Sequence, residues 1–153
     1  MLSELVDREL KGVKPELGQD ILEALMTEWA SAPQNLPEEV RKAQEEASRE
    51  VALSLFDLRL GRAVEGERVI GFDEGIFEMI LRLRKLYADL LTGKLLYSKG
   101  KILCSVKQEL FMHGKKLDVG ELVNLELDEA FALITAGYLS PYSPPVASTN
   151  ESA

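Results

Sequence analysis

Hydrophobic residues recur with the period of an α-helix along the first ninety positions of the chain. One such series, with a spacing of four residues, consists of Leu17, Ile21, Leu25 and Trp29. Pro15 suits the first position of this helix, because the N–H that proline lacks has no partner there. The proline-containing stretch 32–37 interrupts the series, and Pro37 can open a second helix that we expect to run to about Val64.

The second half of this helix and the helix that follows it contain more apolar side chains than one buried stripe requires. Between residues 51 and 60, apolar residues surround the helix on nearly every side. Asp73 is a suitable N-cap for the third helix, and Gly93 fits the position just after its end. A helix that is apolar all round is buried on all sides. We therefore expect this surface to be covered either within a compact helical bundle or by a partner subunit.

If a partner covers this surface, the contacts should resemble those of a domain core cut in half. Aromatic side chains dominate the energetics of interfaces, so Phe56, Phe77 and Tyr87 should contribute most. The alternative is that these aromatic side chains lie in the chain's own core. The predicted subunit-interface residues are Leu53, Phe56, Leu58, Leu60, Phe77, Ile80, Leu83 and Tyr87.

Downstream of residue 94 the hydrophobic period changes from that of a helix to that of a strand. Ile102, Cys104 and Val106 lie at alternate positions, as the inward residues of a half-buried strand do. His113 and Gly114 form a plausible hairpin turn. We expect the other short strands at 109–112, 115–117, 121–125 and 138–139, and a short helix at 129–136 that Asp128 can cap and Gly137 can end.

These patterns predict a mainly α protein with a small C-terminal β-rich module, an α+β arrangement of two domains. The helical domain should span residues 1–93 and the β-rich domain residues 94–142. The tail at 143–153 lacks apolar anchors and is expected to be disordered.

Composition indicates a soluble globular protein with few of the residues that commonly serve in catalysis. Of the 153 residues, 46% are hydrophobic and 29% are charged. The single cysteine, Cys104, excludes an intrachain disulfide, and the single histidine, His113, removes most histidine-based catalysis. Adjacent acids such as Glu45 and Glu46 do not face each other on a helix, and no glycine-rich phosphate loop is present. We expect no enzymatic activity, no cofactor and no metal site.

The chain shows no targeting or membrane segment. Residues 1–10 lack the basic start and apolar run of a signal peptide. The longest apolar stretches, such as 51–56, are far shorter than the ~20 residues needed to cross a bilayer. Because a disulfide pattern is also absent, we expect a cytoplasmic protein.

The net charge of −8 is divided unevenly along the chain. Residues 94–125 contain six lysines and three acidic residues, a net charge of +3, which leaves −11 for the remainder. This basic segment could be steered toward an acidic partner or nucleic acid, or its lysines could simply be solvated and keep strand edges from pairing. Aromatic residues are not interleaved with basic ones in the way that base stacking requires, so direct nucleic-acid contact is not expected. The candidate partner-contact residues are Lys107, Lys115 and Lys116.

Several segments resemble subunits of the GINS family, small proteins of the archaeal and eukaryotic replicative helicase assembly. Residues 55–64, LFDLRLGRAV, resemble the leucine- and arginine-rich core helix of that family, and residues 72–74, FDE, are similar to the cap of its next helix. Residues 114–125, GKKLDVGELVNL, are similar to its small β domain. The order of helical domain and β domain resembles the archaeal helix-first subunit. The chain departs from the family pattern at Gly61, where a long side chain is more usual. Glycine at this position weakens the helix by up to ~1 kcal/mol.

The resemblance implies a GINS-like fold and a non-catalytic scaffold in DNA replication. It also implies that two copies of this subunit and two of a sister GINS subunit form a heterotetramer through their helical domains. That tetramer would connect the MCM helicase to a RecJ-like (Cdc-type) protein, with primase as a further partner, on the chromosome in the archaeal cytosol. Two other hypotheses stay open. The protein could be an independent adaptor with a helical dimerisation domain and an SH3-like β module, or a small enzyme that uses Cys104 or a carboxylate.

Overall fold

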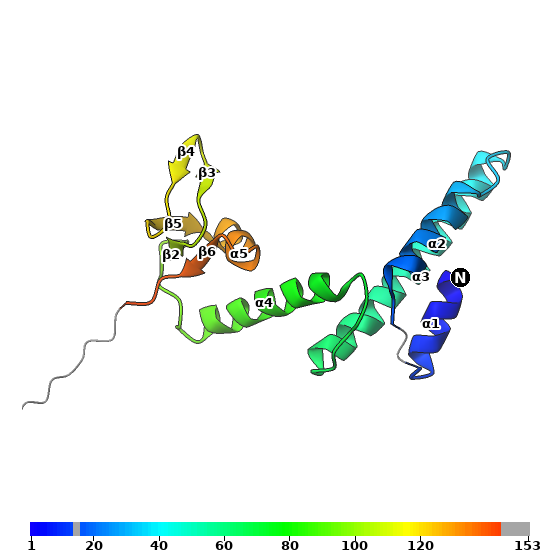
Figure 1. The fold of residues 1–153 in the computed structure, drawn as a ribbon, viewed down its shortest axis with the longest axis horizontal. Coiled ribbons are helices and arrows are strands. Elements are labelled where there is room, and N and C mark those ends of the chain that lie inside the picture. Colours follow the sequence, from blue (N-terminus) through cyan, green and yellow to red (C-terminus); the bar gives the residue numbers. More distant parts are fainter. Residues whose placement is uncertain (14–15, 145–153) are drawn as a thin grey trace, which may run out of the picture. The chain divides into compact units, whose positions relative to one another are not determined.

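The computed structural model describes residues 1–13 and 16–144, in two compact units that meet between Leu81 and Arg82 (Figure 1). The helices are α1 (Leu2–Leu10), α2 (Gln19–Ala30), α3 (Glu38–Val64), α4 (Glu74–Leu91) and α5 (Leu127–Thr135). The strands are β1 (Tyr97–Ser98), β2 (Lys101–Val106), β3 (Leu110–Met112), β4 (Lys115–Leu117), β5 (Leu122–Glu126) and β6 (Leu139–Pro141). The predicted fold class, mainly α with a small β-rich C-terminal part, is confirmed.

The division between the two units falls within α4, which contributes its first half to one and its second half to the other. The strand-rich part begins only at β1. The domain boundary at residue 94 therefore stays a prediction. Of the predicted disordered tail, residues 145–153 lie outside the described residues.

Long helices were predicted well where local signals mark their ends. α3 begins directly after Pro37 and ends at Val64. α4 ends two residues before Gly93, whose φ of 73° is the left-handed conformation that glycine adopts easily. α1 was not predicted, although Leu5 on this helix is buried against α3 in the first unit.

The prediction that Leu17 belongs to the same helix as Ile21, Leu25 and Trp29 is wrong. Leu17 precedes α2 and pairs with Gly71 in an isolated parallel bridge, and its side chain is buried. Its N–H donates to the carbonyl oxygen of Ile70 at 3.2 Å, and its own carbonyl accepts from the N–H of Phe72 at 2.6 Å. The predicted first helical residue, Pro15, lies outside the described residues.

Gly71 is required by this bridge. Its φ is +150°, and a Cβ at this position would collide with the backbone carbonyl of Leu17. A side chain here would therefore strain the backbone and also displace the buried leucine.

We expect Gly71→Ala to lower the free energy of unfolding by about 2–6 kcal/mol, because backbone strain and overpacking each contribute about 1–3 kcal/mol. Urea denaturation of the full chain measures this loss. Gly66→Ala is the matched control, because Gly66 also has a positive φ but has open space around it. Equal losses for the two variants would contradict the role of the Leu17 contact.

A buried ion-pair network holds α1, α3 and the start of α4 together within the first unit. Arg59 on α3 is 1% exposed. Its Nε and Nη2 donate to the two carboxylate oxygens of Asp73 at 2.6 and 2.8 Å, and its Nη1 donates to Glu9 at 2.9 Å. Nη2 also donates to the carbonyl oxygen of Ile70 at 3.1 Å. Asp73 directly precedes α4, as predicted, and its carbonyl oxygen accepts from the N–H of Phe77 at 3.1 Å. Its carboxylate binds Arg59.

Arg62 completes the network on the next turn of α3. Its Nη1 donates to both carboxylate oxygens of Glu9 at 2.9 Å, and its Nε donates to Glu67 at 3.0 Å. Burial alone would lower the pKa of Arg62, but hydrogen bonds and charges from Glu67 and Glu9 outweigh it and raise the pKa. Two cations thus share the buried carboxylate of Glu9.

Arg59→Met should lower the free energy of unfolding by about 3–5 kcal/mol, because the buried carboxylate of Asp73 would lose its cation and that of Glu9 would keep only Arg62. Arg68→Met is the control: Arg68 is exposed and pairs with Glu74 at 3.0 Å, so its loss should be below about 1 kcal/mol. Chemical denaturation at neutral pH measures both. A small loss for Arg59→Met would show that the network does not hold this unit together.

The second unit contains one sheet with β2 at its centre. β2 pairs antiparallel with β5 along one edge and with β1 and β6 along the other. Ile102, Cys104 and Val106 are buried, which confirms the predicted alternation. The hydrophobic core of this unit consists of Leu95, Ile102, Cys104, Val106, Leu117, Leu125, Ala130 and Leu139, with Leu90 of α4 packed against it.

A separate two-stranded sheet is formed by the β3–β4 hairpin. His113 and Gly114 make its turn with φ of 50° and 74°, as predicted. The predicted cap of the short helix is wrong: α5 begins at Leu127 with Glu126 as N-cap, and Asp128 lies in its first turn, where its carboxylate accepts from the N–H of Glu129 at 2.9 Å.

Candidate interaction surfaces

An apolar groove of about 280 Å³ lies among the helices of the first unit. Its floor contains Leu5, Leu17 and Leu55, the buried residues of one hydrophobic cluster. The Arg59–Asp73 ion pair also lines it. The apolar side chains that line it and remain exposed by 38–56% are Met26 and Trp29 of α2, Phe56 of α3 and Ile76 of α4. Such a surface is typical of a protein–protein contact.

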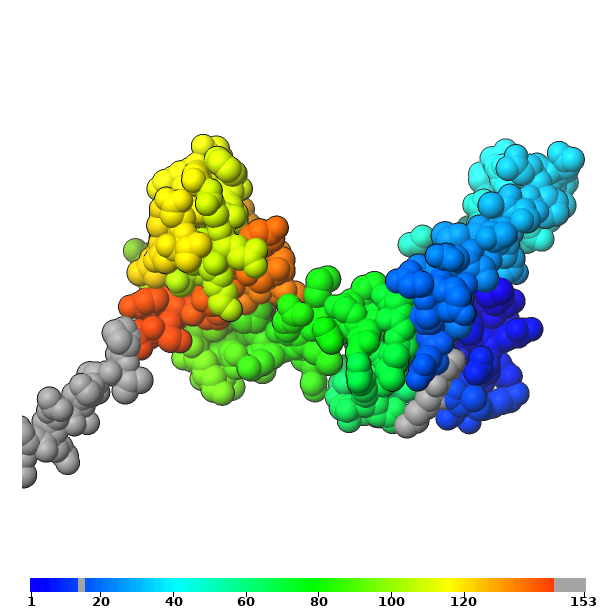
Figure 2. Space-filling view, viewed as in Figure 1, coloured from blue at the N-terminus to red at the C-terminus, as the bar shows by residue number. Residues whose placement is uncertain are grey.

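α2 contributes to this groove without being buried itself. Every residue of α2 is at least partly exposed, although the helix contains Leu22, Leu25, Met26 and Trp29. Ile21 and Leu25 of α2 pack against the hydrophobic cluster that contains Leu55 of α3. The space-filling view shows both helices at the surface of the first unit (Figure 2). Met26 and Trp29 were not among the predicted interface residues; their spacing of three on an amphipathic helix was the available signal.

The predicted interface residues of the first unit differ in exposure. Leu53 is 53% exposed and Phe56 is 38% exposed, whereas Leu58, Leu60 and Ile80 are half-buried. Phe77 is 2% exposed and belongs to one of the chain's own hydrophobic clusters, the alternative left open for the aromatic side chains. Its ring lies against that of Phe56, with 5.3 Å between the centroids, so Phe77 supports an exposed aromatic residue from beneath.

In the second unit, the two predicted interface residues lie one turn apart on α4. Leu83 is 42% exposed and Tyr87 is 59% exposed. Tyr87 also lines a hollow with Phe131 and the β1–β2 turn at Lys99 and Gly100. None of these exposures tests contact with a partner, and the interface residues stay predictions.

The three lysines predicted to contact a partner have different environments. Lys116 is 2.7 Å from a carboxylate oxygen of Glu109 and 3.7 Å from one of Asp118, and both groups raise the pKa of Lys116. Lys107 and Lys115 are exposed and have no ion-pair partner among residues 1–13 and 16–144. Lys115 is therefore freer than Lys116 to bind an external group.

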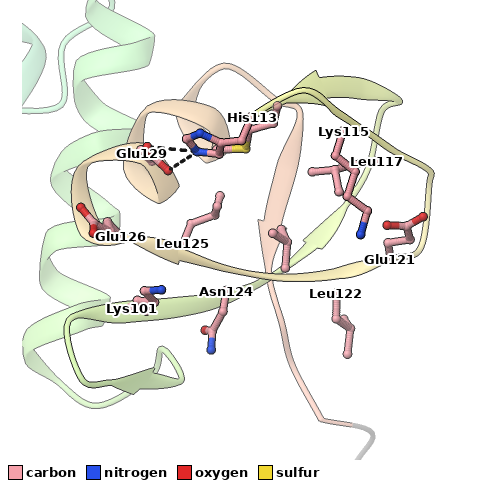
Figure 3. A pocket seen from close by; sticks show the side chains of 12 residues that line it. Lys101, His113, Lys115, Leu117, Glu121, Leu122, Asn124, Leu125, Glu126 and Glu129 are labelled. Carbon is pink, nitrogen blue, oxygen red and sulfur yellow. Dashed lines mark hydrogen bonds and ion pairs between the residues drawn. The ribbon is translucent and has the colours of Figure 1, made fainter.

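Lys115 lines a second groove, which follows β5 and the β3–β4 hairpin (Figure 3). This groove has a volume of about 490 Å³. His113 reaches across from the hairpin turn, and its Nε2 lies 3.5 Å from the carboxylate of Glu129 on α5. All five residues of β5 line the groove.

Cys104 is placed as a core residue. Its side chain is fully buried, and burial raises the pKa of its thiol to about 11. The thiolate is the nucleophilic form, so burial and a raised pKa both make this thiol less reactive than an exposed one. Within the described residues, no group of three His, Cys, Asp or Glu side chains is arranged to hold a metal ion, and no described helix could cross a membrane.

Cys104 should react with an aromatic disulfide reagent at pH 8 roughly 100-fold more slowly in the folded protein than in urea, because reaction requires local opening. The raised pKa also predicts a pH dependence of stability: the thiol's contribution is fully present below about pH 9 and is lost as the pH rises toward about 11. Absorbance-monitored labelling and urea titrations at pH 8 and pH 10.5 measure these effects. Rapid labelling of the folded protein would contradict the burial of Cys104.

Two family models match this chain. The model for the N-terminal domain of the GINS complex Gins15 subunit matches residues 1–73, and the model for its C-terminal domain matches residues 93–143. The chain belongs to the GINS subunit family. Membership implies a role in the GINS complex in DNA replication, partners within that complex, and a non-catalytic class of subunit. No curated protein and no solved structure matches the chain.

The two matches include the candidate surfaces of this GINS subunit except for the residues that α4 contributes to them. The N-terminal match ends at Asp73, so it includes Glu9, Arg59 and the whole buried network. The C-terminal match includes the sheet and the β3–β4 hairpin. All of α4 lies between the two matches.

Proposed function

We propose that this GINS subunit is a non-catalytic scaffold that binds a sister GINS subunit through the exposed apolar surface of its helical unit. The observation that carries the proposal is the apolar groove with Met26, Trp29, Phe56 and Ile76 at its rim. Burial of these side chains is favourable at roughly 25 cal/mol per Å². Obligate subunit interfaces are built from such apolar surfaces.

The finer proposal follows from family membership and from the resemblance to the archaeal helix-first subunit. Two copies of this subunit and two of the sister subunit form a heterotetramer that supports the MCM helicase. The β-rich module is then free to bind a RecJ-like (Cdc-type) protein and primase. The proposal includes action on the chromosome in an archaeal cytosol.

Trp29→Ser should weaken assembly with the sister subunit at least tenfold, about 1.4 kcal/mol, because tryptophan is enriched among the residues that dominate the binding energy of an interface. Val64→Ser is the matched control, since Val64 is 40% exposed but does not line the groove. Co-expression followed by size-exclusion chromatography with light scattering measures the assembly, and thermal melting verifies that both variants fold.

Two outcomes would contradict the proposal. If Trp29→Ser and Val64→Ser assemble equally well with the sister subunit, the groove is not the interface. If the chain forms a stable homodimer and does not bind the sister subunit, the hypothesis of an independent adaptor is favoured over that of a scaffold subunit.

A further inference from the structure

One edge of β5 (Leu122–Glu126) is open. β5 stands at the end of the strand order β1–β2–β5, so its second edge pairs with no strand in the described part of the chain. Short edge strands present unpaired N–H and C=O groups, which another extended chain can bind. The open edge of β5 can therefore form backbone hydrogen bonds with another chain.

The orientation of the backbone at this edge follows from the groups around Leu103 of β2. Leu103 donates its N–H to the carbonyl of Leu96 at 3.1 Å, and its carbonyl accepts from the N–H of Tyr142 at 3.0 Å. Both groups thus point away from β5. Asn124 lies directly opposite Leu103, and residues opposite each other in an antiparallel pair share the same orientation. The N–H and C=O of Asn124 therefore point away from β2, toward the open edge.

The groove along β5 provides space and an apolar floor for such a chain. Met112 and Leu117 of the hairpin and Val123 of β5 line it and pack against the hydrophobic core of the second unit. A strand that pairs with β5 would place every second side chain on these residues, since side chains alternate between the two faces of a strand. Figure 3 shows the hairpin and β5 as the two walls.

The charges of the groove indicate which kind of molecule fits. Three basic and three acidic side chains line it: Lys101, His113, Lys115, Glu121, Glu126 and Glu129. Nucleic acids and other polyanions require a net positive surface, which this groove lacks. A polypeptide that is apolar at alternate positions and has no strong net charge matches it.

We propose that β5 binds an extended segment of a partner protein as an added β-strand. Main-chain hydrogen bonds to the outward groups of Asn124 hold the segment, and its alternate apolar side chains rest on Met112, Leu117 and Val123. This mode of recognition gives affinity through the backbone and specificity through the side-chain floor. The site is distinct from the helical surface proposed for subunit assembly.

The test uses a displayed library of ten-residue peptides that alternate apolar and polar positions, selected against the full chain. We expect Asn124→Pro to weaken the selected peptides at least tenfold, because proline removes the outward N–H while the β2–β5 ladder does not use it. Asn124→Ala is the matched control, because it loses the same side chain but keeps the N–H. Its affinity should stay within about twofold of the unsubstituted protein.

Hydrogen exchange on the unsubstituted protein provides a second measurement that does not depend on the stability of the proline variant. The amides of Leu122 and Asn124 should exchange quickly in the free protein and become protected by a selected peptide. Those of Val123 and Leu125, which face β2, should be protected in both states.

The proposal is overturned if no library peptide binds better than a scrambled sequence. It is overturned equally if Asn124→Pro and Asn124→Ala bind the peptides alike, or if the amide of Asn124 gains no protection. Assembly of Asn124→Pro with the sister subunit, measured by light scattering, should be unchanged. A failure at this edge is thereby distinguishable from a failure of the proposed scaffold function.

Discussion

The first unit depends on the burial of one guanidinium group. Removing Arg59 from water is unfavourable by several kcal/mol, and only closely placed hydrogen-bonding partners can offset that penalty. The partners come from three places in the chain: Glu9 on α1, Ile70 in the loop, and Asp73 at the start of α4. Because all three must converge on the same side chain, α1 and the start of α4 have one favourable position against α3. These elements line the apolar groove together with α2, so the positions of the walls that α1, α3 and α4 provide follow from the network.

Elements with a local signal could be predicted from the sequence. Pro37 and Gly93 bracket helices, His113-Gly114 makes a hairpin turn, and alternation marks β2. α1 was not predicted because its buried face contains Glu9, and a glutamate is normally expected to be exposed to solvent. The partners that allow its burial, Arg59 and Arg62, are 50 and 53 residues away in the sequence. Leu17 continues a helical period by spacing alone, but a long-range bridge to Gly71 takes it out of the helix. Long-range pairing overrides local preference in both cases.

For the candidate sites too, the sequence pattern predicts some features, and others depend on contacts between distant residues. An excess of apolar residues on α3 and α4 could be recognised from the sequence, but not that Phe77 lies beneath Phe56. Lys115 and Lys116 are neighbours on β4 and so point to opposite faces of a strand, which the period of two predicts. Which of them would be neutralised depends on Glu109 and Asp118, whose positions come from the turns that flank the hairpin.

The two proposed surfaces rely on different physical interactions, and this difference suits two kinds of contact. The helical groove gains free energy by removing apolar area from water, which favours a lasting association with another subunit. Binding at the edge of β5 gains free energy by completing backbone hydrogen bonds along a strand of five residues. Each such bond contributes only about 0.5–1.5 kcal/mol net. A short edge with glutamates at Glu121 and Glu126 resists indiscriminate pairing, which limits binding there to segments that also fit the floor. Since each unit has its own core, a reversible contact at the strand edge can form and break without disturbing the helical contact.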